Sequence, residues 1–159
     1  MGKGTTFSLY FPEVDANAGR KKRKSSVSFR IKGDYRALII DDDIQSLRVI
    51  EEEFKLLGFE TVKAVDCSSL PDSFLRRNNF DLFVIDLEMP GMTGEECIRK
   101  ILNVKKEAKI LVVSGYPGDE RIEKAISLGA KAYLEKPFDS ELLAAKLADI
   151  YGTTGTGTR

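Results

Sequence analysis

The chain has 159 residues, with 25 basic and 25 acidic side chains and no histidine, which excludes Ser-His-Asp catalysis and histidine metal sites. Its content of 42% hydrophobic and 31% charged residues is typical of a soluble globular domain with a core. No apolar run approaches the roughly 20 residues of a membrane span and the N-terminus lacks a signal-peptide core, so we expect a cytoplasmic protein without membrane contact.

Charge is distributed unevenly along the chain. Residues 1–33 carry eight Lys/Arg against two acidic residues, and residues 16–33, with an unbroken basic run at 20–24, predict a solvated basic linker. Residues 34–150 carry 16 basic and 23 acidic residues, which argues against bound nucleic acid and favours a cation site. The glycine- and threonine-rich residues 151–159 predict a disordered tail.

Short apolar runs alternate with amphipathic segments from residue 37 onward. The runs predict strands at residues 37–40, 59–65, 82–85, 110–113 and 131–135. Each strand is followed by a segment with helical spacing of apolar residues: the first ends at Gly58, the second spans 69–77 with Pro71 in its first turn, and the last spans 140–150. Cys67 and Cys97 are far apart and form no metal-ligand or redox motif, so we expect small residues on or beneath a helix.

Five strands alternating with five helices predict an α/β fold with a parallel sheet covered on both faces. Right-handed crossovers leave few topologies open. We expect the flavodoxin-like (βα)5 doubly wound sheet with five strands in the order 2-1-3-4-5, an order taken from known folds of this kind. Its ligand crevice lies at the carboxyl ends of the strands, beside the switch point between the first and third strands.

Polar residues stand at the carboxyl ends of the predicted strands. The first strand leads into Asp41 and Asp42, the third into Asp86, the fourth into Ser114 and the fifth into Lys136. Because these ends open on the same edge of a parallel sheet, we expect three carboxylates, one hydroxyl and one ammonium group to converge in a single crevice.

Taken singly, such residues have structural explanations; Asp43, for example, is expected to cap the helix that follows it. Three carboxylates packed together, however, raise one another's pKa unless a cation neutralises them. All-oxygen ligands suit Mg²⁺ or Mn²⁺, which completes its shell with water and phosphate oxygens. We therefore expect phosphoryl transfer onto Asp86 as nucleophile, with the metal, Lys136 and Ser114 covering the phosphoryl oxygens.

At these residues the chain resembles the receiver family of two-component response regulators, over residues 35–150. The resemblance rests on LIIDDD at 38–43, VIDLEMPG at 84–91, VSG at 113–115 and YLEKPF at 133–138. It implies that Asp41 and Asp42 hold the metal, and that Asp86 is the phosphoacceptor and also a metal ligand. It further implies that the backbone carbonyl of Glu88 is a metal ligand and that Lys136 contacts the phosphoryl group, next to a bond to proline that is often cis in this family.

The resemblance also implies a switch. Ser114 stands where Thr is commoner and keeps the hydroxyl, and Gly115 is the small residue that phosphate access requires. A phosphoryl group on Asp86 should draw the Ser114 hydroxyl toward it and leave space for the ring of Tyr133 to turn inward. The fourth helix, fifth strand and fifth helix would form the readout surface and, in a homodimer, the contact. The acidic side chain of Glu88 beside the phosphoryl site is expected to alter the dephosphorylation rate and the metal affinity, and the sequence does not predict in which direction.

The resemblance implies a histidine kinase or a histidine phosphotransfer protein as the partner, and a receiver that catalyses only its own phosphorylation and dephosphorylation. Residues 2–12, GKGTTFSLYFP, resemble the final glycine box and last strand of a histidine-kinase ATP-binding domain. Residues 1–15 would then be the remnant of that domain, and 34–150 the C-terminal receiver of a hybrid sensor kinase. An arbitrary glycine-rich start followed by a strand is the alternative.

Three other functions compete with this interpretation. An aspartyl-phosphate phosphatase of the haloacid-dehalogenase type also uses Asp and Mg²⁺, but it needs a second Asp two residues after the nucleophile, where this chain has Glu88. A flavodoxin-like binding module needs a phosphate-binding loop after the first strand, where three acidic residues would repel a flavin phosphate. A pseudo-receiver that only binds partners is disfavoured by the complete set of site residues.

Overall fold

The computed structural model describes residues 34–116, 118 and 120–152, which contain five strands and five helices in strict alternation. The strands are β1 (Arg36–Ile40), β2 (Glu60–Ala64), β3 (Leu82–Asp86), β4 (Ile110–Ser114) and β5 (Ala132–Glu135). The helices are α1 (Ile44–Leu56), α2 (Asp72–Arg77), α3 (Gly94–Val104), α4 (Glu120–Leu128) and α5 (Ser140–Tyr151). All neighbouring strands pair in parallel in the order β2-β1-β3-β4-β5, which confirms the predicted topology.

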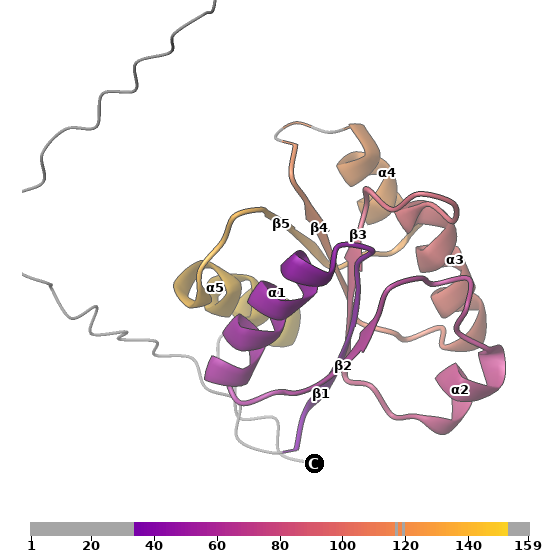
Figure 1. Ribbon diagram of the computed structural model, residues 1–159, viewed down its shortest axis with the longest axis horizontal. Helices are drawn as coiled ribbons and strands as arrows, with labels where there is room; N and C mark the ends of the chain where they lie inside the picture. The colour runs from indigo at the N-terminus through magenta and orange to yellow at the C-terminus, as the bar shows by residue number, and fades with distance from the viewer. Residues whose placement is uncertain (1–33, 117, 119, 153–159) are drawn as a thin grey trace, which may run out of the picture.

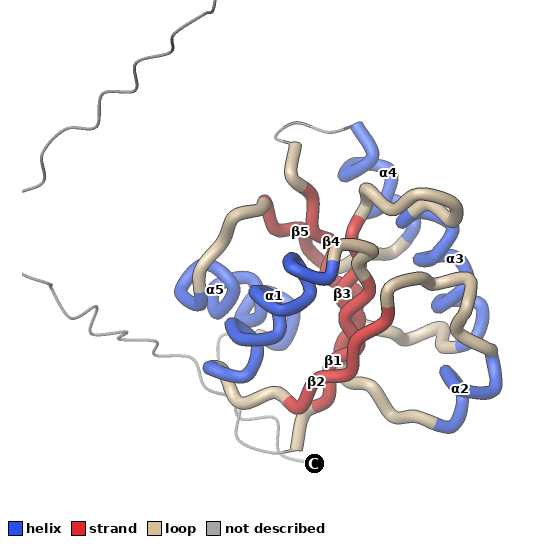
Figure 2. The backbone as a smooth tube through the Cα atoms, in the orientation of Figure 1, coloured by secondary structure: helices blue, strands red, loops and turns tan. Residues whose placement is uncertain are grey.

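The sheet lies between two layers of helices (Figures 1 and 2). Helices α1 and α5 cover one face, with Phe54 and Leu147 in the core there, and α2, α3 and α4 cover the other, with Leu75 and Ile101. Every residue of β3 and β4 is buried, as a central parallel strand requires, and this explains their continuous apolar sequences.

Side-chain caps fix where α1 and α3 begin. The Asp43 carboxylate accepts the Gln45 N–H at 2.9 Å at the start of α1, which confirms its predicted role. Thr93 and Glu96 form a reciprocal capping box at the start of α3. These helices begin at the carboxyl edge of the sheet, where the predicted site lies.

Two helix ends differ from the sequence prediction. Helix α2 begins at Asp72 and not at residue 69, because the Asp66 carboxylate accepts the backbone N–H groups of Ser68 and Ser69 and holds that stretch as a turn. Helix α5 continues through Tyr151, whose hydroxyl donates to the Asp81 carbonyl at 3.0 Å. Burial in this contact raises the pKa of the Tyr151 phenol, and the residue belongs to the packed domain and not to the tail.

The expected kinase remnant at 1–15, the basic linker at 16–33 and the tail from residue 153 onward lie outside the described residues. Within the part of the chain that is described, none of the helices combines the length and the apolar character needed to cross a membrane.

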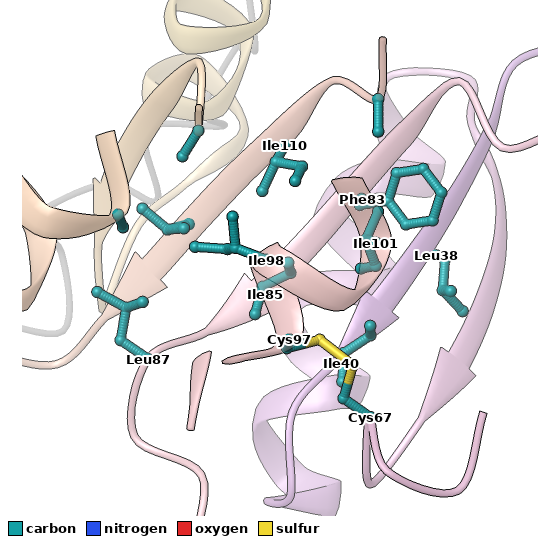
Figure 3. Close-up of a cluster of buried hydrophobic side chains, with 14 of the residues drawn as sticks. Leu38, Ile40, Cys67, Phe83, Ile85, Leu87, Cys97, Ile98, Ile101 and Ile110 are labelled. Atoms are coloured by element: carbon teal, nitrogen blue, oxygen red, sulfur yellow. A yellow bond between two sulfur atoms is a disulfide. The ribbon is translucent and has the colours of Figure 1, made fainter. Parts of the chain in front are cut away.

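The two cysteines are bonded to each other, which the sequence interpretation missed. Cys67 follows β2 and Cys97 lies in the first turn of α3, with Cα atoms 5.8 Å apart. Both side chains are buried beside Ile40 and Ile98 (Figure 3), so their expected burial is right, but treating them as two separate small residues was wrong. The cause is topological: the loop after β2 and the start of α3 meet on one face although 30 positions separate the cysteines.

Candidate functional site

The carboxyl edge of the sheet brings the predicted polar residues together. Asp41 is the first residue after β1, Asp86 the last of β3, Ser114 the last of β4 and Lys136 the first after β5. The register pairs Ser114 with Glu135 and Asp86 with Val113, so these strands end at the same level.

Three of these residues form an acidic cluster. One carboxylate oxygen from each of Asp41, Asp42 and Asp86 lies within 4.8 Å of the others. Asp41 is fully buried, Asp86 is 4% exposed and Asp42 is exposed, so the cluster opens to solvent on one side. Carboxylates this close repel one another unless a cation lies between them, and a set of oxygen donors without nitrogen or sulfur fits Mg²⁺ or Mn²⁺.

Lys136 supplies positive charge to the cluster. Its Nζ lies 2.7 Å from Oδ2 of Asp41 and 3.2 Å from Oδ2 of Asp86, so one ammonium group bridges two of the acids. The peptide bond that follows Lys136 is cis, as the sequence resemblance implied, and the Lys136 N–H donates to the Ser114 carbonyl at 2.8 Å. The side chain is thus held between the ends of β1, β3 and β4.

The electrostatics of the site follow from these contacts. Burial raises the pKa of the Asp86 carboxyl, the nearby Asp41 charge raises it further, and the Lys136 charge opposes both. Burial alone would lower the pKa of Lys136, but the hydrogen bond to Asp41 and the charge of Asp86 outweigh it, and the pKa is raised. Lys136 therefore carries its charge at neutral pH.

Asp41 is held by more partners than the sequence indicated. Its Oδ1 accepts the Asp43 N–H at 2.9 Å, and its Oδ2 accepts the Ser46 hydroxyl at 2.5 Å as well as Lys136. Sequence reasoning missed Ser46; a hydroxyl at the third position of the helix that follows the acids is the signal that could have revealed it. These contacts fix the buried carboxylate in one orientation.

The loop after β3 faces the acceptor. The backbone N–H of Glu88 donates to Asp86 Oδ1 at 3.3 Å. The Glu88 carboxylate lies over Gly115, where an added Cβ would stand 3.3 Å from Oε2 of Glu88. Ser114 is buried at the end of β4, and its hydroxyl oxygen accepts the Tyr116 N–H at 3.2 Å. A small residue at position 115 therefore makes room for the Glu88 side chain.

Tyr133 is not part of the convergent group. It lies on β5 with 41% of its surface exposed, and the ammonium group of Lys146 stands 5.5 Å from the centre of its ring. The ring thus occupies an exposed position on the edge strand of the sheet.

The chain is similar in sequence to known proteins. Residues 37–148 match the family model of the response regulator receiver domain. The chemotaxis protein CheY of Treponema pallidum is 31% identical over 118 residues, covering 73% of this chain and 82% of that protein. The corresponding protein of Pseudomonas aeruginosa is 30% identical over 118 residues, covering 73% and 95%.

Solved structures are similar as well. The chemotaxis protein CheY4 of Vibrio cholerae matches with a TM-score of 0.66 at 25% identity, covering 74% of this chain and 99% of that one. A CheY-like receiver domain protein of Methanospirillum hungatei matches with a TM-score of 0.65 at 26% identity, covering 74% and 93%.

Proposed function

We propose that this chain, which belongs to the response regulator receiver domain family of two-component signalling, accepts a phosphoryl group on Asp86. The observation that carries the proposal is the position of this carboxylate. It is almost fully buried at the end of β3, with oxygens of Asp41 and Asp42 within 4.8 Å and the ammonium group of Lys136 at 3.2 Å.

The proposed donor is a phosphohistidine on a histidine kinase or a histidine phosphotransfer protein. A carboxylate oxygen of Asp86 forms a bond to phosphorus while the P–N bond of the phosphohistidine breaks and the imidazole leaves. The chain contains no histidine, so the donor residue must belong to another protein or another segment. Later attack of water on phosphorus releases phosphate and restores the carboxylate.

We assign the supporting roles from the contacts of each residue. Asp41, Asp42, Asp86 and the backbone carbonyl of Glu88 would hold Mg²⁺ or Mn²⁺, which neutralises charge on a phosphoryl oxygen when bound. Lys136 already stands between two of the acids, and this position supports a role in contacting a second phosphoryl oxygen.

The proposed switch runs from Ser114 to Tyr133. The buried Ser114 hydroxyl would move toward a phosphoryl group on Asp86, and the exposed ring of Tyr133 would then turn inward and alter the surface of α4, β5 and α5. That surface is also our proposal for a homodimer contact.

Beryllofluoride, a phosphoryl mimic, tests this switch by NMR. With Mg²⁺ present, the amide resonance of Ser114 and the ring resonances of Tyr133 should both shift. A spectrum in which Asp86 responds and Tyr133 stays unmoved would contradict the coupling.

We also infer that the parent protein is a hybrid histidine kinase and that the receiver lies in the cytoplasm, where ATP supplies the phosphoryl group of phosphohistidine. The support is the resemblance of residues 2–12 to the end of a kinase ATP-binding domain, in a segment outside the described residues.

Incubation with acetyl phosphate and Mg²⁺, followed by intact-mass measurement, tests the proposed acceptor. We expect an addition of about 80 Da that requires the metal, is absent from Asp86→Asn and is retained in Asp72→Asn, an exposed control on α2. A wild-type mass that stays unchanged although Mg²⁺ binds would contradict phosphoacceptance and favour a pseudo-receiver.

A further inference from the structure

One arginine connects helix α4 to the loop that follows the acceptor. Arg121 lies in the first turn of α4, and its Nη1 donates to the carbonyl of Leu87 at 3.0 Å. Its Nη2 lies 3.6 Å from Oε1 of Glu88. The guanidinium group therefore contacts both the backbone and a side chain of this loop.

The carbonyl that Arg121 binds belongs to the same peptide group as the N–H that faces Asp86. The Leu87–Glu88 peptide is a planar trans unit, so its carbonyl and its N–H point in opposite directions. The carbonyl meets Arg121, and the N–H meets Asp86 Oδ1 at 3.3 Å. A charged donor on the carbonyl fixes the plane of the peptide and polarises it, which makes the N–H a stronger donor.

A second ion pair joins α4 to α3. Lys124, one turn further along α4, places its Nζ 2.5 Å from Oε2 of Glu95, and the Glu95 side chain is only 10% exposed. Glu95 lies in the first turn of α3, next to Gly94, where an added Cβ would stand 2.7 Å from the Asp86 carbonyl oxygen. Helix α4 therefore makes two separate ion pairs, and the one made by Lys124 does not involve the Leu87–Glu88 peptide.

Arg121 also restrains the negative charge of the Glu88 carboxylate. The Glu88 carboxylate lies over Gly115, beside the end of β4, and Arg121 is its partner in an ion pair. Without the guanidinium group this carboxylate would add unbalanced negative charge near the acidic cluster and oppose an approaching phosphoryl group.

We propose that Arg121 is a positioning residue for phosphoryl transfer: it aims the Glu88 N–H at the oxygens on Asp86 and holds the Glu88 carboxylate aside. The inference rests on the proposed function of Asp86. Both effects act in the same direction, so loss of Arg121 slows phosphorylation. Helix α4 thereby sets the reactivity of the acceptor as well as carrying part of its surface.

Phosphorylation rates with acetyl phosphate at saturating Mg²⁺ test this role. We expect Arg121→Gln to be about five- to tenfold slower than wild type, which corresponds to the net value of one ordinary hydrogen bond. Arg121→Lys keeps one donor and the charge, and should recover part of the rate. Lys124→Gln is the matched control, because it removes the other ion pair of α4 without touching the Leu87–Glu88 peptide, and its rate should stay within about twofold of wild type.

A Glu88→Gln background distinguishes the effect of Arg121 on the Glu88 N–H from its effect on the Glu88 carboxylate, because the carboxylate charge is then absent. There Arg121→Gln should still slow the reaction, since the peptide carbonyl remains. The ¹⁵N-labelled amide of Glu88 in the beryllofluoride complex provides a readout that a general loss of stability would not move, and its resonance should shift in Arg121→Gln and not in Lys124→Gln.

The failures of the two proposals are distinguishable. If wild-type protein is phosphorylated and Arg121→Gln reacts at the same rate, or is no slower than Lys124→Gln, the proposed role of Arg121 is wrong. The proposal that Asp86 accepts the phosphoryl group is then unaffected. If wild-type protein is not phosphorylated at all, the proposed function itself fails.

Discussion

Asp86 is placed where the surrounding protein disfavours its charge. Burial raises the pKa of this carboxyl, and Asp41 raises it further, while Lys136 compensates only in part. A charged carboxylate in this position lowers folding stability, and a bound cation would stabilise it. Such a loss of stability is expected at a functional site.

Replacing Asp86 with Asn should therefore stabilise the fold at neutral pH. Because the folded-state pKa lies above the unfolded value, the carboxyl favours the folded state at low pH and disfavours it once the pH has risen through the folded pKa. We expect Asp86→Asn to gain on the order of 1 kcal/mol at pH 7, measured by urea unfolding without metal. The gain should vanish as the pH falls below the unfolded value of about 3.9.

Added Mg²⁺ provides the control for this measurement. It should raise the unfolding midpoint of the wild type more than that of Asp86→Asn, because the variant lacks one of the three charges. An Asn variant that is no more stable than wild type at pH 7 would show that Lys136 already balances the cluster.

The residues of the site differ in how far the sequence could identify them. Asp41, Asp86 and Lys136 stand at strand ends, and the parallel topology alone brings them to one edge. Arg121 carries no such signal, because its role depends on the distance between α4 and a loop from another part of the chain. Ser46 was missed although it is local: its hydroxyl lies in the first turn of α1, five positions after Asp41. A basic residue in the first turn of a helix opposes the helix dipole, so Arg121 offered at most a weak hint.

At the scale of the element, α3 begins in contact with the backbone of the acceptor. A Cβ added to Gly94 would stand 2.7 Å from the Asp86 carbonyl oxygen and 2.8 Å from the Cα of Leu87. Both atoms belong to the backbone, so they can give way only if the end of β3 moves. The sequence shows only a glycine where this helix begins. The packing shows that its lack of a side chain lets α3 lie directly against the backbone of Asp86 and Leu87.

We expect Gly94→Ala to displace Asp86 and slow its phosphorylation by acetyl phosphate about tenfold or more, because small misplacements of reacting groups are costly. Thr93→Ala is the matched control: it removes the capping box at the same end of α3 and should cost about 1 kcal/mol of stability. Its phosphorylation rate should remain near that of wild type. Equal rates for the two variants would mean that Asp86 tolerates the added methyl group.

Strand and helix identities were predictable because apolar runs and caps are local signals. The continuous apolar sequences of β3 and β4 reflect burial on both faces, and Asp43 caps α1 as expected. The start of α2 was not predictable from spacing, because the turn centred on Asp66 competes with the helix for Ser69.

At the scale of the whole molecule, the Cys67–Cys97 bond links the loop after β2 to α3. The link closes a loop of 30 positions that includes β3 and the acceptor. The Lys100 ammonium group also donates to the Cys67 carbonyl at 2.9 Å, a contact between the loop and α3 that does not involve the sulfur atoms. A reducing cytoplasm would keep the pair as thiols, and the fold would then depend on such contacts.

Reduction should lower stability without abolishing the fold. Closing a loop of this size is worth about 3 to 4 kcal/mol in the chain-entropy treatment, so the free energy of urea unfolding should fall by an amount of this order when reductant is added. A Cys67→Ala/Cys97→Ala variant should be insensitive to reductant. If thiol counting confirms reduction and the midpoint of the wild type does not change, the bond does not stabilise the fold.

The proposed function depends on Asp86 being the residue that accepts the phosphoryl group. Borohydride reduction of the acetyl phosphate-treated protein converts an aspartyl phosphate to homoserine, and peptide mass spectrometry then locates that residue. We predict homoserine at position 86, only in samples that contained Mg²⁺. Homoserine at position 41 or 42 in place of 86, or at none of the three, would contradict the account.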